Sequence, residues 1–433
     1  MPLFPLTAKV NGQGHVCVGG CDVVDLAREF GTPLYLFDEF TLRHKCREFK
    51  AKFTTCYPDT MVIYAAKAFL HRALVTILKE EGLGLDVVSG GELSIAHCVD
   101  FPAAQVYFHG NNKTPEELQL ALDWEIGRFV VDNFYELGLL DGLAKAKRRN
   151  QCILLRLTPG VDPHTHEYTT TGTLDSKFGF PLATGQAEEA VKQAMSASNL
   201  DLVGFHFHLG SPILETTPYE VAMEIILNFT ARMRQKFGSQ LSEFSIGGGF
   251  AVQYTVDYKV PDVADYAQAI TAKLNKIISQ MGLSSPRLII EPGRAIVGQA
   301  GIALYKVGAI KEIPDIRKYV CVDGGMSDNI RPALYTARYE AMVANKASSP
   351  EHDVVTIAGK LCESGDILVR DANLASVSPG DIIAIPVCGA YCLPMASNYN
   401  ALLKPAIAIV NNGAAHLIRH RETYQDLMHL DAG

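Results

Sequence analysis

Short apolar runs recur along the first three hundred residues, and stretches with helical spacing separate them. Runs rich in β-branched and aromatic side chains predict buried strands. The stretch 115–122 places apolar residues at helical spacing after Thr114, which is a favourable N-cap. The predicted strands are 33–38, 61–66, 85–88, 105–108, 128–131, 152–157, 202–207, 243–246 and 287–290.

This alternation of strand and helix indicates a parallel sheet covered by helices. A closed, TIM-like (β/α)8 barrel takes eight such units in about 250 residues. A doubly wound sheet would more often carry a nucleotide fingerprint after its first strand, so the barrel fits better. Nine strands are predicted but the barrel has eight, and we interpret 33–38 as a lead-in to the barrel.

The pattern changes after about residue 300, where short alternating runs with turn residues predict a mostly β domain. Examples are 301–307, 354–357 and 381–385. The first thirty residues also look strand-like, and the termini of a discontinuous domain often meet. We therefore predict a barrel over 35–300 and a β-domain made of 1–34 and 301–433.

Charge and composition narrow the class of protein. A net charge of -8 argues against nucleic-acid or anionic-membrane partners, which reward clustered Lys and Arg. Ten scattered cysteines lack the spacing of a disulfide scaffold, and the first residues lack a secretion signal. The longest apolar region, 288–310, is interrupted by Glu291, Arg294 and Lys306, so we predict no membrane span. Because the cysteines are expected to be reduced thiols, we predict a cytoplasmic protein.

Polar residues follow the predicted barrel strands, and in a barrel all these strand ends open on one face. Taken singly, each has an ordinary explanation: a lone lysine after a strand is usually solvated. His206 and His208 resemble a metal pair, but alternate strand residues point the same way with or without a metal, and no Cys or carboxylate lies at ligand spacing, so we predict no metal. The residues at these ends are Lys67, Asp86, His109, Asp132, His206, His208, Gly247–Gly249 and Glu291–Arg294.

Gly247–Gly249 stands between a predicted strand and a predicted helix. Three glycines can form a flexible turn, but their backbone N–H groups can also approach a phosphate. No Gly-Lys-Ser/Thr follows, so this is not a P-loop. A lysine amine, a phosphate cradle, a carboxylate and an arginine on one face together indicate a phosphorylated aldehyde cofactor.

The motifs resemble those of the fold type III, or group IV, pyridoxal-phosphate-dependent decarboxylases, and among them the members that act on diaminopimelate. The resemblance covers nearly the whole chain and implies an alanine-racemase-like barrel with a β-domain. It rests on Tyr64–Ala68, Gly84–Leu93, His109–Lys113, Pro159–Tyr168, Asp175–Gly179, His206–Ser211, Glu291–Arg294, Cys362–Asp366 and Met395–Asn400.

For the cofactor, the resemblance implies that Lys67 holds pyridoxal 5'-phosphate as a Schiff base. His208 would stack on the pyridine ring, the glycines would bind the phosphate, and Glu291 would keep the pyridine nitrogen protonated. The implied cofactor-binding set is Lys67, Asp86, His208, Ser211, Gly247, Gly248, Gly249, Glu291, Pro292, Gly293, Arg294 and Tyr399.

For the substrate, the resemblance implies decarboxylation of meso-2,6-diaminopimelate to L-lysine and CO2, the last step of lysine biosynthesis. Cys362 would be the catalytic proton donor and Glu363 would accept the distal ammonium. In this family both residues serve the lysine of the other subunit, which implies a homodimer with shared active sites. The implied substrate-binding residues are Arg294, Arg331, Tyr335, Glu363 and Tyr399.

Three alternatives stay open at the level of the sequence. The first is a related decarboxylase of D-ornithine, D-lysine or carboxynorspermidine; Arg331 and the Cys362–Asp366 motif favour diaminopimelate. The second is a racemase, against which Glu291 argues. The third is a catalytically silent relative. The stretch Cys392–Pro394 departs from the family pattern and bears on substrate preference.

Overall fold

The computed structural model describes residues 1–162, 171–173 and 175–432, so most of the predicted motif Pro159–Tyr168 lies outside the described residues. The chain forms two compact units. The barrel unit comprises Cys46–Ala251 and Val260–Gly293. The sheet unit comprises Met1–Lys45, Val252–Lys259 and Arg294–Gly433, so it includes residues 35–45, 252–259 and 294–300 that the sequence assigned to the barrel.

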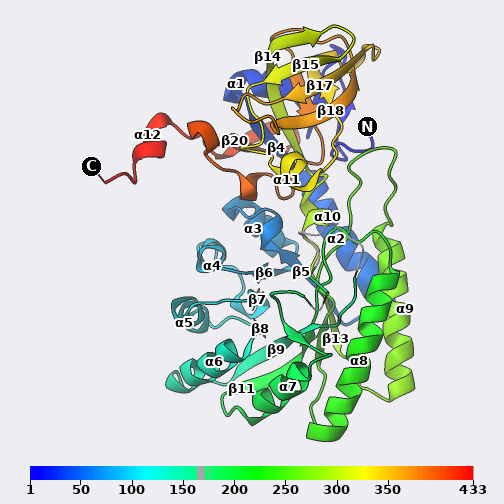
Figure 1. Cartoon of the computed structure of the whole chain (residues 1–433), viewed down its shortest axis with the longest axis vertical. Coiled ribbons are helices and arrows are strands. Elements are labelled where there is room, and N and C mark those ends of the chain that lie inside the picture. Colours follow the sequence, from blue (N-terminus) through cyan, green and yellow to red (C-terminus); the bar gives the residue numbers. More distant parts are fainter. Residues whose placement is uncertain (163–170, 174, 433) are drawn as a thin grey trace. The chain divides into compact units, whose positions relative to one another are not determined.

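Eight parallel strands close into the barrel because β9 pairs with both β8 and β11 (Figure 1). A short ninth strand, β10 (Phe180–Pro181), is added beside β9. The predicted (β/α)8 fold is therefore confirmed. The barrel strands are β5 (Thr60–Ala65), β6 (Gly84–Val87), β7 (Val106–Phe108), β8 (Arg128–Val131), β9 (Gln151–Thr158), β11 (Leu200–His206), β12 (Glu243–Ser245) and β13 (Arg287–Ile290).

Helices that precede or follow these strands cover the outside of the barrel (Figure 1). The predicted helix after Thr114 is present, and its Thr114 and Glu117 side chains form a capping box. Asp262 and Asp265 do the same for the helix that precedes β13. The helices are α2 (Glu39–Cys56), α3 (Arg72–Glu80), α4 (Gly90–His97), α5 (Pro115–Asp123), α6 (Phe134–Ala146), α7 (Gln186–Ser196), α8 (Thr217–Phe237) and α9 (Val263–Met281).

Side chains from neighbouring strands fill the barrel interior. Ile63, Tyr107, Val130, Leu154 and Ile289 form one buried cluster. Large branched and aromatic residues make this interior a packed core rather than a pore, which leaves the polar strand ends as the face open to ligands.

The sheet unit is built on a second nine-stranded sheet. The run interpreted as a lead-in to the barrel is a strand of this sheet: Leu34–Asp38 (β4) pairs antiparallel with β14 and parallel with β20. The other strands are β14 (Gly301–Ile313), β15 (Arg317–Val322), β16 (Met342–Val343), β17 (Asp353–Ala358), β18 (Ile367–Leu374), β19 (Ile382–Ile385), β20 (Ala406–Asn411) and β21 (Ala414–Arg419).

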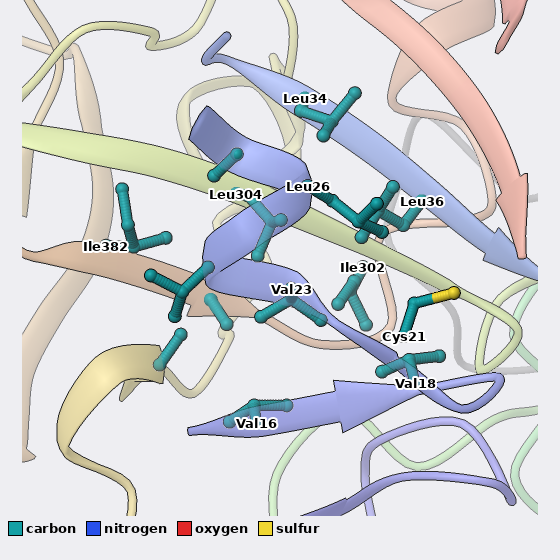
Figure 2. Packing of buried hydrophobic residues seen from close by; sticks show 14 of the residues in the cluster. Val16, Val18, Cys21, Val23, Leu26, Leu34, Leu36, Ile302, Leu304 and Ile382 are labelled. Carbon is teal, nitrogen blue, oxygen red and sulfur yellow. The ribbon is translucent and has the colours of Figure 1, made fainter. Parts of the chain in front are cut away.

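The N-terminal residues add three short strands and a helix to this unit. Val23 and Leu26 of α1 (Val23–Phe30) lie against Leu34 of β4 and Ile302 of β14 in one hydrophobic cluster (Figure 2). Burying such side chains stabilises the sheet by about 1.5–3 kcal/mol each. The remaining elements are β1 (Lys9–Val10), β2 (Val16–Val18), β3 (Cys21–Asp22), α10 (Arg294–Val297), α11 (Arg331–Tyr335) and α12 (Tyr424–Met428).

Within the described part of the chain, none of the helices combines the length and the apolar character that crossing a bilayer would require.

Candidate active site

Strand register brings the polar ends of the barrel strands together. Asp86 of β6 is paired with Ala65 of β5, and Lys67 follows Ala65 by two residues. His206 is paired with Arg156 on one side and with Ser245 on the other. Because all eight strands are parallel, these side chains occupy the same end of the barrel.

Lys67 lies in a 3-10 turn (Ala66–Ala68) directly after β5, and its side chain is exposed while its neighbours are buried. The segment that carries Glu291 approaches this turn closely: the Ala65 N–H donates to the Pro292 carbonyl at 3.2 Å. A Cβ at Gly293 would come within 3.0 Å of Ala65 and Ala68. A residue larger than glycine would therefore crowd the point where the two strand ends meet.

Glu291 is buried, and both of its oxygens are engaged. The Ser245 hydroxyl donates to Oε1 at 2.7 Å, and the His206 Nε2–H donates to Oε2 at 3.2 Å. Burial alone would raise the pKa of the Glu291 carboxyl, but His206, His109 and the Ser245 hydroxyl together hold the pKa well below its ordinary value. Glu291 is thus a fixed, ionised carboxylate at the centre of the strand ends.

Two buried histidines flank this carboxylate. Burial lowers the pKa of both His109 and His206, so both imidazoles are neutral near pH 7. Ligand atoms of His109, His206 and Glu291 lie within 4.8 Å of one another. No carboxylate lies at ligand spacing in the sequence around His206, but the fold brings Glu291 to it from 85 residues away. Its hydrogen bonds to Ser245 and His206 favour a positioning network over a metal site.

Asp86 is the second buried carboxylate at these strand ends. Its Oδ1 has no hydrogen-bond partner among the described residues, and it lies 3.7 Å from His109 Nε2. Burial, and then the charge of Glu291, raise the pKa of Asp86 well above its ordinary value. His109 Nε2 and His206 Nδ1 likewise lack partners in the described structure. Buried polar atoms of this kind are typical of a site that binds a polar ligand.

Gly247–Gly249 form a tight turn between β12 and Phe250. Gly247 and Gly249 have positive φ values of 71° and 110°. A Cβ at Gly248 would stand 2.2 Å from the Glu291 carbonyl oxygen. The Gly247 N–H donates to Ser245 Oγ and the Gly248 N–H donates to His208 Nδ1, both at 3.2 Å. Side chains are thereby excluded from the turn, although the N–H groups of Gly247 and Gly248 already have acceptors within the protein.

His208 accepts the Gly248 N–H through Nδ1, so its own proton is on Nε2. Burial, and then Lys67, lower the pKa of His208 well below its ordinary value. Ser211 follows in the segment that runs beside the glycine turn, where Ile213 forms a β-bridge with Phe250. A neutral imidazole and a serine therefore lie next to the turn.

In the sheet unit, two buried arginines contact the same tyrosine. Arg294 Nη1 donates to the Tyr254 hydroxyl at 2.8 Å. The Arg331 guanidinium lies 4.6 Å from the centre of the Tyr254 ring and donates to the Tyr339 hydroxyl. Tyr335, the last residue of α11, is half-buried one turn along from Arg331.

Cys362 and Glu363 lie in a loop of the sheet unit, and both side chains are exposed. Asp366 organises this loop by accepting the N–H groups of Leu361 and Met326. The Cys362 N–H donates to Asn400 Oδ1 at 2.8 Å, which holds Cys362 beside the turn that begins at Tyr399. Cys362 and Glu363 are therefore exposed on a loop that is hydrogen-bonded to the turn carrying the exposed Tyr399.

The predicted residues thus divide between the units. The barrel unit contains the lysine, histidines, glycines and Glu291, and the sheet unit contains the arginines, Tyr335 and the Cys362 loop. The sequence did not single out Ser245, Tyr254 or Tyr339. Ser245 is the second-last residue of the predicted strand 243–246, so its position gave a weak signal; the two tyrosines lie in loops and gave none.

The chain matches the family model described as the pyridoxal binding domain of pyridoxal-dependent decarboxylases over residues 41–298. It is 46% identical over 425 residues to the diaminopimelate decarboxylase of Bacillus subtilis (strain 168), covering 98% of this chain and 97% of that protein. It is 40% identical over 443 residues to the diaminopimelate decarboxylase of Mycobacterium tuberculosis (strain CDC 1551 / Oshkosh), covering 99% and 97%. Among solved structures, diaminopimelate decarboxylase from M. jannaschii in complex with L-lysine is similar, with a TM-score of 0.93, 36% identity and coverage of 99% and 98%.

Proposed function

The chain belongs to the family of pyridoxal-dependent decarboxylases, and from this premise we propose that it converts meso-2,6-diaminopimelate to L-lysine and CO2, the last step of lysine biosynthesis. Relatives with this name match over nearly their full length, and one similar structure binds L-lysine. The observation that carries the proposal is the exposed Lys67 amine on the barrel face where Glu291 is held ionised.

The residues of the barrel unit fit pyridoxal 5'-phosphate. The glycine turn carries no side chain that would block a phosphate, and Asp86 and His109 present buried polar atoms that lack hydrogen-bond partners among the described residues. Lys67 would hold the aldehyde carbon, Gly247–Gly249 with Ser211 the phosphate, and His208 one face of the ring. When bound, the cofactor supplies an aldehyde for the substrate amine and an electron-withdrawing ring.

Glu291 is the residue that favours decarboxylation over racemisation. Held ionised by Ser245 and His206, it would keep the pyridine nitrogen of a bound cofactor protonated. The neutral His109 and His206 add no competing positive charge beside that nitrogen. A racemase would favour an uncharged nitrogen, so the buried carboxylate supports decarboxylation.

The residues of the sheet unit recognise the amino-acid group that is retained. Arg294, Arg331 and Tyr335 bind its carboxylate with guanidinium forks and a phenol. Glu363 accepts its ammonium, and Tyr399 completes this set. Cys362 donates its thiol proton to the carbon that loses CO2; the exposure of its side chain supports this role.

We further infer a cytoplasmic homodimer in which Cys362 and Glu363 of one protomer serve Lys67 of its partner. The exposed position of both side chains supports transfer to a second copy. All ten cysteines are free thiols, in keeping with a reducing compartment.

Product analysis tests the proposed function. Purified holoenzyme is incubated separately with meso-, LL- and DD-diaminopimelate, and CO2 and L-lysine are measured. We expect stoichiometric release of both from the meso isomer. D-ornithine, D-lysine and carboxynorspermidine are the competing substrates, and CO2 from one of these without any from meso-diaminopimelate would contradict the substrate assignment. A yellow protein inactive on all of them would identify a silent relative.

A further inference from the structure

Two positively charged side chains of the sheet unit share one aromatic partner. Arg294 Nη1 donates to the Tyr254 hydroxyl at 2.8 Å, and its guanidinium carbon lies 5.8 Å from the centre of the ring. The Arg331 guanidinium carbon lies 4.6 Å from the same centre. Tyr254 therefore touches both arginines, one through its hydroxyl and its ring, the other through its ring alone.

Arg331 is buried among aromatic side chains, so its contact with Tyr254 is one of the few in the described structure that hold its charge. Its side chain is buried, and among the described residues no acidic side chain forms an ion pair with it. Tyr339 accepts a hydrogen bond from Arg331 and packs edge-to-face on Tyr254, with ring centres 5.3 Å apart. A buried guanidinium without a carboxylate partner is costly and remains free to pair with an incoming anion.

Rigid placement matters because two guanidinium groups repel each other and have flexible side chains. Ring faces attract cations, whereas a carboxylate at this position would neutralise the pair and compete with a bound anion. The Tyr254 ring thus holds both charges in place without neutralising either. Such preorganisation reduces the conformational entropy lost on binding.

We propose that Tyr254 is a positioning residue that holds Arg294 and Arg331 for the retained carboxylate of the substrate. This inference rests on the proposed function, since that function supplies the carboxylate. Tyr254 acts through the two arginines, so it governs binding of the carboxylate-bearing end rather than the chemistry at Lys67.

Two ligands separate this role from a general structural one. L-lysine retains the carboxylate that the arginines would bind, and 1,5-diaminopentane is the same molecule without it. Tyr254→Phe removes the hydroxyl bond to Arg294 and keeps the ring, whereas Tyr254→Leu removes both. Tyr258→Phe, in the same segment but exposed, is the matched control.

The experiment measures steady-state kinetics with meso-diaminopimelate and competitive inhibition by the two amines, using holoenzyme. For Tyr254→Phe we expect KM to rise about tenfold, with kcat within a factor of about two, as loss of one charge-assisted hydrogen bond predicts. Inhibition by L-lysine should weaken about tenfold while inhibition by 1,5-diaminopentane stays constant. Tyr254→Leu should show about a hundredfold loss for L-lysine, and Tyr258→Phe should match wild type.

Cofactor absorbance of each variant checks that the barrel site is intact. If Tyr254→Phe retains the wild-type KM and the wild-type ratio of L-lysine to 1,5-diaminopentane inhibition, Tyr254 does not position the arginines. Equal weakening of both inhibitors would likewise overturn the inference, because it indicates general damage. If the wild-type enzyme releases no CO2 from meso-diaminopimelate, the result contradicts the proposed function itself rather than the role of Tyr254.

Discussion

The polar residues of the barrel unit and those of the sheet unit are positioned by different means. In the barrel, backbone register sets neighbours: His206 stands beside Ser245 because β11 pairs with β12. In the sheet unit, Arg294 and Arg331 come from short helices and are held by tyrosine side chains. The first arrangement depends on main-chain hydrogen bonds, and the second on side-chain packing.

This difference predicts how substitutions act. A change at a barrel strand end removes a chemical group while register keeps the neighbours in place. A change in the sheet unit allows the remaining side chains to move, because rotamers rather than strands define their positions. The pKa shifts of the buried carboxylates do not follow this division: the pKa of Glu291 lies below its ordinary value, whereas those of Asp86 in the barrel and Asp328 in the sheet unit lie above it.

The largest expected effect is at Lys67. Lys67→Ala should reduce decarboxylation by at least about a thousandfold and abolish the yellow absorbance of bound cofactor, because no other amine would hold the aldehyde. Lys79→Ala, an exposed lysine of α3, is the control and should be silent. A yellow, active Lys67→Ala protein would show that strand-end placement does not determine the catalytic lysine.

A smaller effect is expected at Ser245. Ser245→Ala removes the hydroxyl that joins the Gly247 N–H to Glu291, so kcat should fall about tenfold and cofactor affinity should weaken. Ser239→Ala is the matched control, since this buried hydroxyl has no hydrogen-bond partner among the described residues. Unchanged kcat and cofactor titration in Ser245→Ala would mean that register alone orients Glu291.

The smallest effect concerns stability. Burial raises the pKa of Asp328 to about 6, more than the Tyr305 and Tyr35 hydroxyls lower it. The protonated carboxyl therefore favours the folded state below about pH 4, and this contribution is lost as pH rises through about 6. The free energy of unfolding is measured with urea at about pH 4 and about pH 7. The difference between the two values should be about 2–3 kcal/mol smaller in Asp328→Asn than in wild type.

The exposed Asp25→Asn variant is the control for this measurement, and its pH dependence should equal that of wild type. An Asp328→Asn protein with the wild-type pH dependence would show that the three hydrogen bonds to Asp328 fully offset its burial.

The barrel could be predicted because its signal is local. The eight strands lie within two residues of the predicted runs, and Lys67, His208 and Glu291 stand at or just after their strand ends. The run 33–38 was identified as a strand but assigned to the wrong element, because its hydrophobic pattern does not specify which strand it pairs with.

The positions of Tyr254 and Tyr339 could not be predicted from the sequence. Each lies in a loop, and their contact spans 85 residues of chain. Contacts of this kind depend on rotamers and packing that no periodicity encodes. The same reason explains why Glu291 was not expected beside His206.

Strand β4 also constrains the order in which the protein can fold during synthesis. Leu34–Asp38 leaves the ribosome early, but its partner β20 is made about 370 residues later. At about 5–20 residues per second, β4 waits for roughly 20–75 s before that edge can be paired. During this interval an apolar strand presents free backbone groups, so nascent chains interrupted before Ala406 are the forms of this protein most exposed to aggregation and to chaperones.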